Sequence, residues 1–152
     1  MAYYKDVREY LRALEEHGKL VRVTRAINKD TELHPLVRLQ YRGLPEEERR
    51  AFLFEKVVDI KGRSYGMPIA IACYAGSLDI YALGMQCKKE EIYPKWTHAQ
   101  AHPVKPVIVG SAPCQERIVD GDELKRKGLD MLPVPISTPG FDNGPTQLRL
   151  TL

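Results

Sequence analysis

Two histidines of this sequence have a spacing that could bind a metal ion. His98 and His102 lie four residues apart, and in a helix this spacing places both imidazoles on one face. A zinc site of this type also needs a third ligand, and a hydrolytic site needs a glutamate base; the pattern contains neither. Pro103 follows directly, so the helix is expected to end at His102. We therefore favour two surface histidines over a metal site.

The three cysteines, Cys73, Cys87 and Cys114, show no CxxC spacing and are odd in number. This pattern favours reduced thiols in a cytosolic protein over disulfides. A nucleophilic cysteine is activated by a neighbouring base or by a lowered pKa. Because no histidine lies near Cys114 in the sequence, we predict a buried structural thiol at the start of a strand.

Motifs for phosphate and calcium binding are missing from the sequence. Neither GxGxxG nor GxxxxGK[ST] occurs. The run Asp-Gly-Asp-Glu at residues 120–123 resembles part of a calcium loop, but no glutamate closes the loop at the required distance. We predict an acidic turn leading to a short helix. Trp96, with Tyr93 and Lys95, could form a recognition surface, but we favour a helix whose aromatic side chains pack on a sheet.

Composition bounds the class of protein. The chain has 152 residues, 43% hydrophobic residues and a net charge of +3, which suits one ordinary domain. Basic and acidic residues are interleaved, so the sequence shows no basic cluster of the kind that binds nucleic acid or an anionic membrane. The sequence shows no signal peptide and no long apolar run, and we expect a soluble, cytoplasmic protein.

The first elements are predicted from caps and periodicity. Asp6 and Glu9 form a capping box before apolar residues at helical spacing, and Gly18 fits the helix end. Residues 20–27 are rich in β-branched side chains and predict a strand. Asp30 or Thr31 is expected to cap the next helix.

Strands and helices continue to alternate beyond that point. Met67 begins an apolar run that is typical of a central strand covered on both faces. Ser77 is expected to cap a helix, and Pro94 is expected to break another. The other predicted elements are a helix ending at 43, a charged loop at 45–50, strands at 51–58, 107–109 and 114–119, and a turn at 61–63.

Residues 132–145 organise the end of the chain. They contain four prolines and two glycines, so they favour a stiff extended run over a helix or a central strand. Residues 146–152 then alternate like a strand. The pattern predicts an α+β fold, with an α/β layered N-terminal domain at 1–112 and the start of a second domain at 113–152.

Several segments, in order, resemble the N-terminal part of UbiD-family decarboxylases. Residues 6–23 are similar to the first helix, glycine stop and strand of that family. The others are Ala51-Phe52-Leu53-Phe54-Glu55-Lys56-Val57, Met67-Pro68-Ile69 with Gly76-Ser77-Leu78, Pro113-Cys114-Gln115-Glu116 with Gly121-Asp122-Glu123, and residues 129–135 with Asp142-Asn143-Gly144-Pro145.

The resemblance implies a fold and a chemistry for the complete enzyme. It implies that residues 113–152 are the first strands of a truncated split β-barrel of the FMN-binding type. That barrel holds prenylated FMN with Mn²⁺ and K⁺, and the enzymes decarboxylate aromatic or α,β-unsaturated acids, or carboxylate the products. In the family, the Glu-Arg-Glu catalytic set and the Asn, His and Glu metal ligands follow the segment that residues 142–145 of this chain resemble. We therefore assign no catalytic, cofactor or metal residue, including Glu116, Arg117 and Arg149.

Two roles remain open from the sequence. The chain is an N-terminal segment or small subunit that is inactive alone and pairs with a larger UbiD-like subunit or a same-family oligomer. Alternatively, it is a non-catalytic scaffold or regulatory subunit built from the same domain. After Pro145 the family usually continues with an aromatic residue and a longer strand, where this chain has residues 146–152.

Overall fold

The computed structural model describes residues 3–136. Its helices are α1 (Val7–Glu16), α2 (Leu33–Gly43), α3 (Leu78–Met85), α4 (Ile92–Ala101) and α5 (Gly121–Lys127). Its strands are β1 (Leu20–Asn28), β2 (Ala51–Val58), β3 (Ser64–Tyr65) and β4 (Ile69–Ile71). Short 3₁₀ turns, η1 to η4, lie at Glu46–Glu48, Lys89–Glu91, Pro113–Gln115 and Gly128–Met131.

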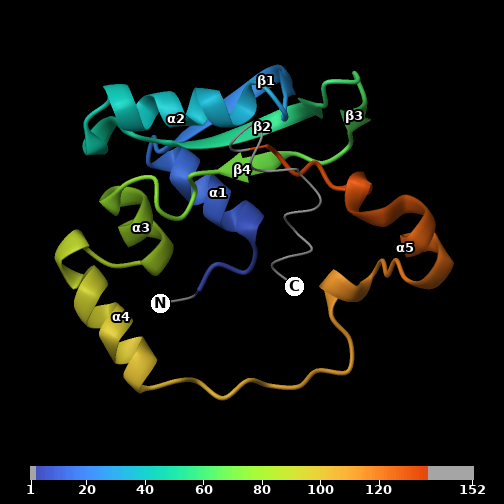
Figure 1. Ribbon diagram of the computed structural model, residues 1–152. Coiled ribbons are helices and arrows are strands. Elements are labelled where there is room, and N and C mark those ends of the chain that lie inside the picture. The colour runs from blue at the N-terminus through green and yellow to red at the C-terminus, as the bar shows by residue number, and fades with distance from the viewer. Residues whose placement is uncertain (1–2, 137–152) are drawn as a thin grey trace.

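The sheet is mixed, and β2 is its central strand. β1 pairs with β2 in parallel, from Leu20 opposite Ala51 to Asn28 opposite Val58, with a shift between Val23 and Ala26. β3 and β4 both pair with β2 in the antiparallel sense. Helices and a mixed sheet together confirm the α+β class (Figure 1).

Each face of β2 is covered by helices, because alternate side chains of a strand point to opposite faces. Leu53 packs in one cluster with Leu14 of α1 and Ile80 of α3. Phe54, its neighbour in sequence, packs in the other with residues of α2. In Figure 1, α2 accordingly lies on one side of the sheet, and α1 and α3 lie on the other.

Local caps were predicted well at two helices and wrongly at one. The Asp6 carboxylate accepts from the backbone N–H of Glu9, and the Ser77 hydroxyl accepts from that of Ile80. α2 instead begins after Glu32, without a side-chain cap. Asp30 or Thr31 was expected to cap this helix. Instead, the side-chain oxygen of Asn28 accepts from the backbone N–H groups of both residues in the turn before the helix.

Two predictions for the middle of the chain need correction. The run that begins at Met67 forms strand only over Ile69–Ile71, all half-buried, and it lies beside β2 instead of at the centre of the sheet. Pro94 does not break its helix. It is the third residue of α4, where its missing N–H would have no partner in the helix anyway.

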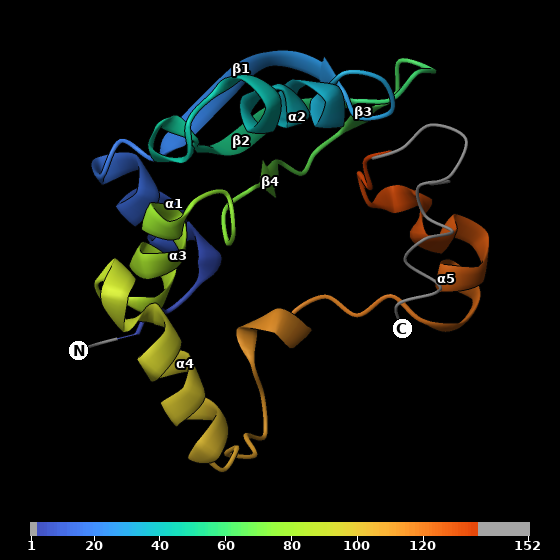
Figure 2. The same cartoon turned by 60° about the vertical axis from the view of Figure 1, so that its left-hand side comes forward.

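The strands predicted at 107–109 and 114–119 are absent from the described structure. Val107 and Ile108 are 84% and 97% exposed in an extended run without regular structure. Figures 1 and 2 both show this run as a thread between α4 and η3, away from the sheet. A β-branched sequence forms a strand only beside another strand, and residues 3–136 place none there.

The structure does not test whether residues 113–152 begin a second domain. Within residues 113–136 the structure has two 3₁₀ turns and α5 but no strand, so the expected first barrel strands do not form there. The short helix predicted after the acidic run is confirmed as α5, but it begins at Gly121, so most of the run predicted as a turn lies in the helix. The strand predicted at 146–152 and most of the 132–145 run lie outside the described residues. The boundary at 112/113 stays a prediction.

Candidate functional site

Tyr10 of α1 is the centre of a cluster of aromatic side chains. It is buried, and its hydroxyl donates to the carbonyl oxygens of Cys73 at 2.6 Å and of Ile80 at 3.0 Å. Burial raises the pKa of the Tyr10 phenol, so this hydroxyl stays a neutral donor. The Tyr4 ring lies 5.1 Å from that of Tyr10, and the Tyr74 ring stacks on that of Tyr10 at 5.9 Å. These contacts join α1 to the segment from β4 to α3.

A hollow of about 380 Å³ opens beside this cluster, between α1 and α3. We call it the tyrosine pocket. Four tyrosines, two aliphatic side chains, one glycine and one carboxylate line it: Tyr4, Tyr10, Tyr74, Tyr81, Val7, Met85, Gly84 and Asp6. None of these carries a positive charge, so the pocket has no group to pair with a carboxylate or a phosphate.

Gly84 lies in the pocket wall and has no side chain that would meet Tyr10. A Cβ at this position would lie 3.1 Å from the Tyr10 hydroxyl oxygen. That oxygen is held by two hydrogen bonds to backbone carbonyls, so it has little room to move. Glycine therefore permits the close approach of α3 to α1.

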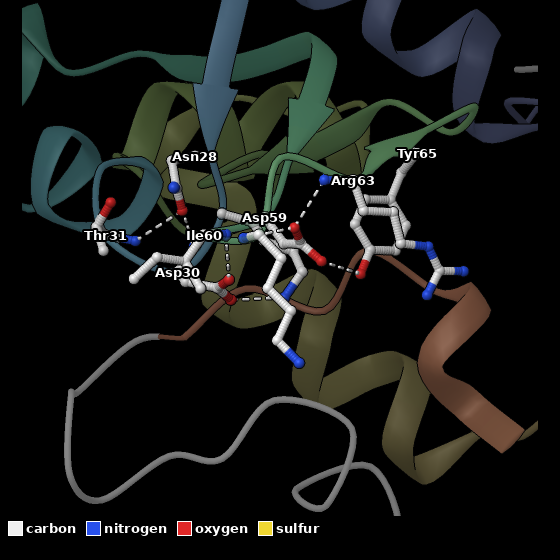
Figure 3. Close-up of polar contacts among 9 residues, drawn as sticks. Asn28, Asp30, Thr31, Asp59, Ile60, Arg63 and Tyr65 are labelled. Atoms are coloured by element: carbon white, nitrogen blue, oxygen red, sulfur yellow. Dashed lines mark hydrogen bonds and ion pairs between the residues drawn. The ribbon is translucent and has the colours of Figure 1, made fainter.

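A second cluster of polar side chains lies where β1 and β2 end (Figure 3). The Lys29 ammonium is 2.6 Å from Asp30 Oδ1, and both side chains are nearly buried. The other carboxylate oxygen of Asp30 accepts from the backbone N–H of Ile60. Asp59 accepts from the N–H groups of Lys61 and Arg63, which forms the predicted turn.

This polar cluster ties distant parts of the chain together. Tyr65 of β3 contacts the Asp59 carboxylate, and the Lys29 ammonium lies 5.7 Å from the centre of its ring. The N–H of Ile136 donates to the carbonyl oxygen of Lys29 at 3.2 Å, and Asp130 lines a hollow beside it. The charged side chains of the cluster contact one another, so the cluster has the features of a contact that stabilises the fold.

The histidine pair lies on the surface, at the end of α4. The rings of His98 and His102 stack 4.2 Å apart at the exposed end of α4. No group of three or more His, Cys, Asp or Glu side chains within residues 3–136 is placed to hold a metal ion. The preference for two surface histidines agrees with this geometry.

The thiols and the aromatic helix differ from expectation in part. Cys114 was expected to be a buried thiol at the start of a strand, but it is exposed in a 3₁₀ turn. Cys73 is the buried thiol, and burial raises its pKa, which keeps it unreactive. Trp96 and Tyr93 do not pack on the sheet. Both are exposed on α4, and Lys95 contacts the carbonyl oxygens of Met85 and Gln86 instead.

The tyrosine pocket does not fit the prenylated FMN that the resemblance implies, because no positively charged side chain in its lining could pair with the flavin phosphate. For Mn²⁺ and K⁺, no group of three or more His, Cys, Asp or Glu side chains within residues 3–136 is placed to hold a metal ion. We therefore assign no step of flavin chemistry to this part of the chain.

No local pattern in the sequence predicts the tyrosine pocket. Tyr10 and Cys73 are 63 positions apart, and the tyrosines come from different elements. Each tyrosine fits the pattern of its own helix or loop. The periodicity of the sequence therefore does not show that these side chains come together in space. A long-range contact prediction could have found it.

Comparisons with known proteins agree with the fold. Residues 11–100 match the family described as 3-octaprenyl-4-hydroxybenzoate carboxy-lyase N-terminal domain, UbiD_N. The phenolic acid decarboxylase of Sedimentibacter hydroxybenzoicus is 31% identical over 126 residues, which cover 78% of this chain and 25% of that protein.

Solved structures give the same picture. The open form of the vanillic acid decarboxylase ShVdcCD from Sedimentibacter hydroxybenzoicus is 27% identical with a TM-score of 0.69, covering 91% of this chain and 28% of that one. An evolved dimeric form of the UbiD-class enzyme HmfF from Pelotomaculum thermopropionicum, in complex with prFMN, is 26% identical with a TM-score of 0.68, covering 90% and 29%. The chain thus spans about a quarter of the length of these relatives. No helix in residues 3–136 is long and apolar enough to cross a membrane.

Proposed function

Because the chain belongs to the UbiD family and carries its N-terminal domain, we propose that it is the N-terminal segment or small subunit of a UbiD-like decarboxylase or carboxylase. The complete assembly acts on aromatic or α,β-unsaturated carboxylic acids with prenylated FMN, Mn²⁺ and K⁺, in the cytoplasm. The chain by itself is inactive. The relatives named above motivate the reaction class, since they are decarboxylases or UbiD-class enzymes.

The observation that carries the proposal is the extent of the match. The family domain accounts for residues 11–100, while the whole chain reaches only about a quarter of the length of its relatives. The flavin site and the catalytic groups belong to the rest of the assembly, and the partner we propose is a larger UbiD-like subunit or another member of a same-family oligomer.

The surface of the chain supports a companion. Val104, Val107, Ile108 and Val109 are 63–97% exposed along the extended run between α4 and η3. Consecutive apolar side chains with unpaired extended backbone are suited to pair with the edge of a sheet. A larger UbiD-like subunit or another member of a same-family oligomer is the partner we propose for this run.

Purification of a tagged chain from its native host tests the proposal. We expect a larger polypeptide to co-purify, and the complex to release CO₂ from a member of a panel of aromatic and α,β-unsaturated acids after addition of prenylated FMN. Tight, stoichiometric flavin binding and turnover by the isolated chain would contradict the inactive-alone part. A stable complex that decarboxylates equally well after removal of this chain would favour the scaffold or regulatory alternative.

A further inference from the structure

The tyrosine pocket has features of a small-molecule site that the proposed catalytic role does not use. Its volume of about 380 Å³ falls in the range of small-molecule sites, roughly 300–1,000 Å³. Aromatic rings and the apolar side chains of Val7 and Met85 make up most of its wall. Such a wall binds a flat ring by burial and by stacking.

The polar groups of the pocket select against negative charge. Asp6 is the charged residue of the lining, and the N–H of Glu9 lowers the pKa of its carboxyl, which is therefore ionised near neutral pH. The Arg8 guanidinium lies 3.8 Å from the Asp6 carboxylate, but Arg8 does not line the pocket and its side chain is 84% exposed. A bound carboxylate would therefore meet the Asp6 carboxylate and no positively charged side chain of the lining, and it would lose its hydration.

The neutral polar groups of the pocket are phenolic hydroxyls. Those of Tyr10 and Tyr4 donate to backbone carbonyls. Tyr74 and Tyr81 also line the pocket. A phenolic hydroxyl both donates and accepts hydrogen bonds, so the lining suits a ligand that carries a hydroxyl of its own.

We infer that the tyrosine pocket binds a small neutral aromatic molecule, such as a phenol, and rejects the corresponding aromatic acid. The choice of ligand class rests on the proposed function. An aromatic carboxylate that loses CO₂ and gains one proton on the ring carbon becomes a neutral aromatic compound. The pocket on the N-terminal domain thus holds the decarboxylated compound, and its lining has no positively charged side chain to pair with the carboxylate of the acid.

Phenol and 4-hydroxybenzoate form a matched pair of probes, because they differ by the carboxylate alone. We titrate each into the 152-residue chain at pH 7 and follow saturation-transfer NMR and calorimetry. A ligand as small as phenol is expected to bind with a dissociation constant of about 1 mM. For 4-hydroxybenzoate we expect binding at least about tenfold weaker.

Tyr74→Ala tests the assignment to this pocket. The Tyr74 side chain is 65% exposed and stacks on Tyr10, so its truncation removes one wall without opening the core. We expect the affinity for phenol to fall about five- to tenfold. The matched control is Tyr93→Ala, which removes a 78% exposed ring from α4 and should leave phenol binding unchanged.

Distinct outcomes overturn the inference. Equal binding of phenol and 4-hydroxybenzoate, wild-type phenol affinity in Tyr74→Ala, or no saturable binding of phenol would each do so. In the last case the companion's apolar side chains become the occupant to test. Failure of the proposed function is recognised separately, because it is measured as CO₂ release by the complex and not as binding to this chain.

Discussion

The hydroxyl of Tyr10 lies 2.6 Å from the carbonyl oxygen of Cys73 and joins two segments that are 63 positions apart. The same hydroxyl lies 3.0 Å from the carbonyl oxygen of Ile80, so its one proton is shared between two backbone acceptors, one of them in α3. Both contacts are buried, and their loss takes the hydroxyl partner away from the Cys73 carbonyl.

Tyr10→Phe should therefore destabilise the chain while leaving the ring in place. We expect the free energy of unfolding to fall by about 1–3 kcal/mol, measured by urea denaturation. Tyr3→Phe is the control, because Tyr3 is 86% exposed, and it should change stability by less than about 0.5 kcal/mol. Equal effects of the two substitutions would contradict a structural role for the Tyr10 bonds.

Local signals in the sequence were sufficient for several elements of the first 80 residues. The caps at Asp6 and Ser77 depend on residues within one helical turn, and both were predicted correctly. The strand predicted at 51–58 became β2, and the one at 20–27 became β1 with one more residue. Such elements carry their own cap, periodicity or β-branched composition.

Features that depend on distant neighbours were not predicted. The run at Met67 is as apolar as a central strand, yet it forms a short edge strand because β2 takes the central place. Val107 and Ile108 have β propensity but no neighbouring strand within residues 3–136. The tyrosine pocket needs residues from α1 and α3 together, and no local pattern encodes that meeting.

Lys29 should be important for stability although it has no assigned catalytic role. It forms a nearly buried ion pair with Asp30, and its removal leaves a carboxylate with less compensation. We expect Lys29→Met to lower the free energy of unfolding by about 3 kcal/mol, measured by thermal and urea denaturation. Lys125→Met is the control. Its ion pair with Asp122 is exposed, so its effect should be below about 0.5 kcal/mol.

Asp79 gives a testable dependence of stability on pH. Hydrogen bonds from Lys89 and from Lys19 lower the pKa of its carboxyl below the ordinary value of 3.8. Stability from this group is therefore present above 3.8 and is lost as the pH falls through the lower, folded-state pKa. The stability difference between the wild type and Asp79→Asn should be constant above about pH 5 and shrink below about pH 4. A difference that stays constant down to acid unfolding would contradict this linkage.

Ile108 should affect assembly without affecting the stability of the chain. Its side chain is 97% exposed in the extended run, so Ile108→Lys should change the free energy of unfolding by less than about 0.5 kcal/mol. The same charge would be buried against the companion, and we expect the yield of the co-purified complex to fall at least about tenfold. Leu39→Lys, at a 63% exposed site on α2, is the matched control and should assemble normally.

Gly84 and Tyr10 should be energetically coupled. Alanine at an ordinary helical glycine gains about 1 kcal/mol of helix propensity, and Gly43→Ala, with open space around its Cβ, should show a gain of this kind. At Gly84 the new Cβ lies 3.1 Å from the fixed Tyr10 hydroxyl, so the gain should be cancelled or reversed. In a Tyr10→Phe background that oxygen is gone, and Gly84→Ala should become stabilising. A double-mutant cycle by urea denaturation should give a coupling of about 1 kcal/mol, and strict additivity of the two changes would refute the contact.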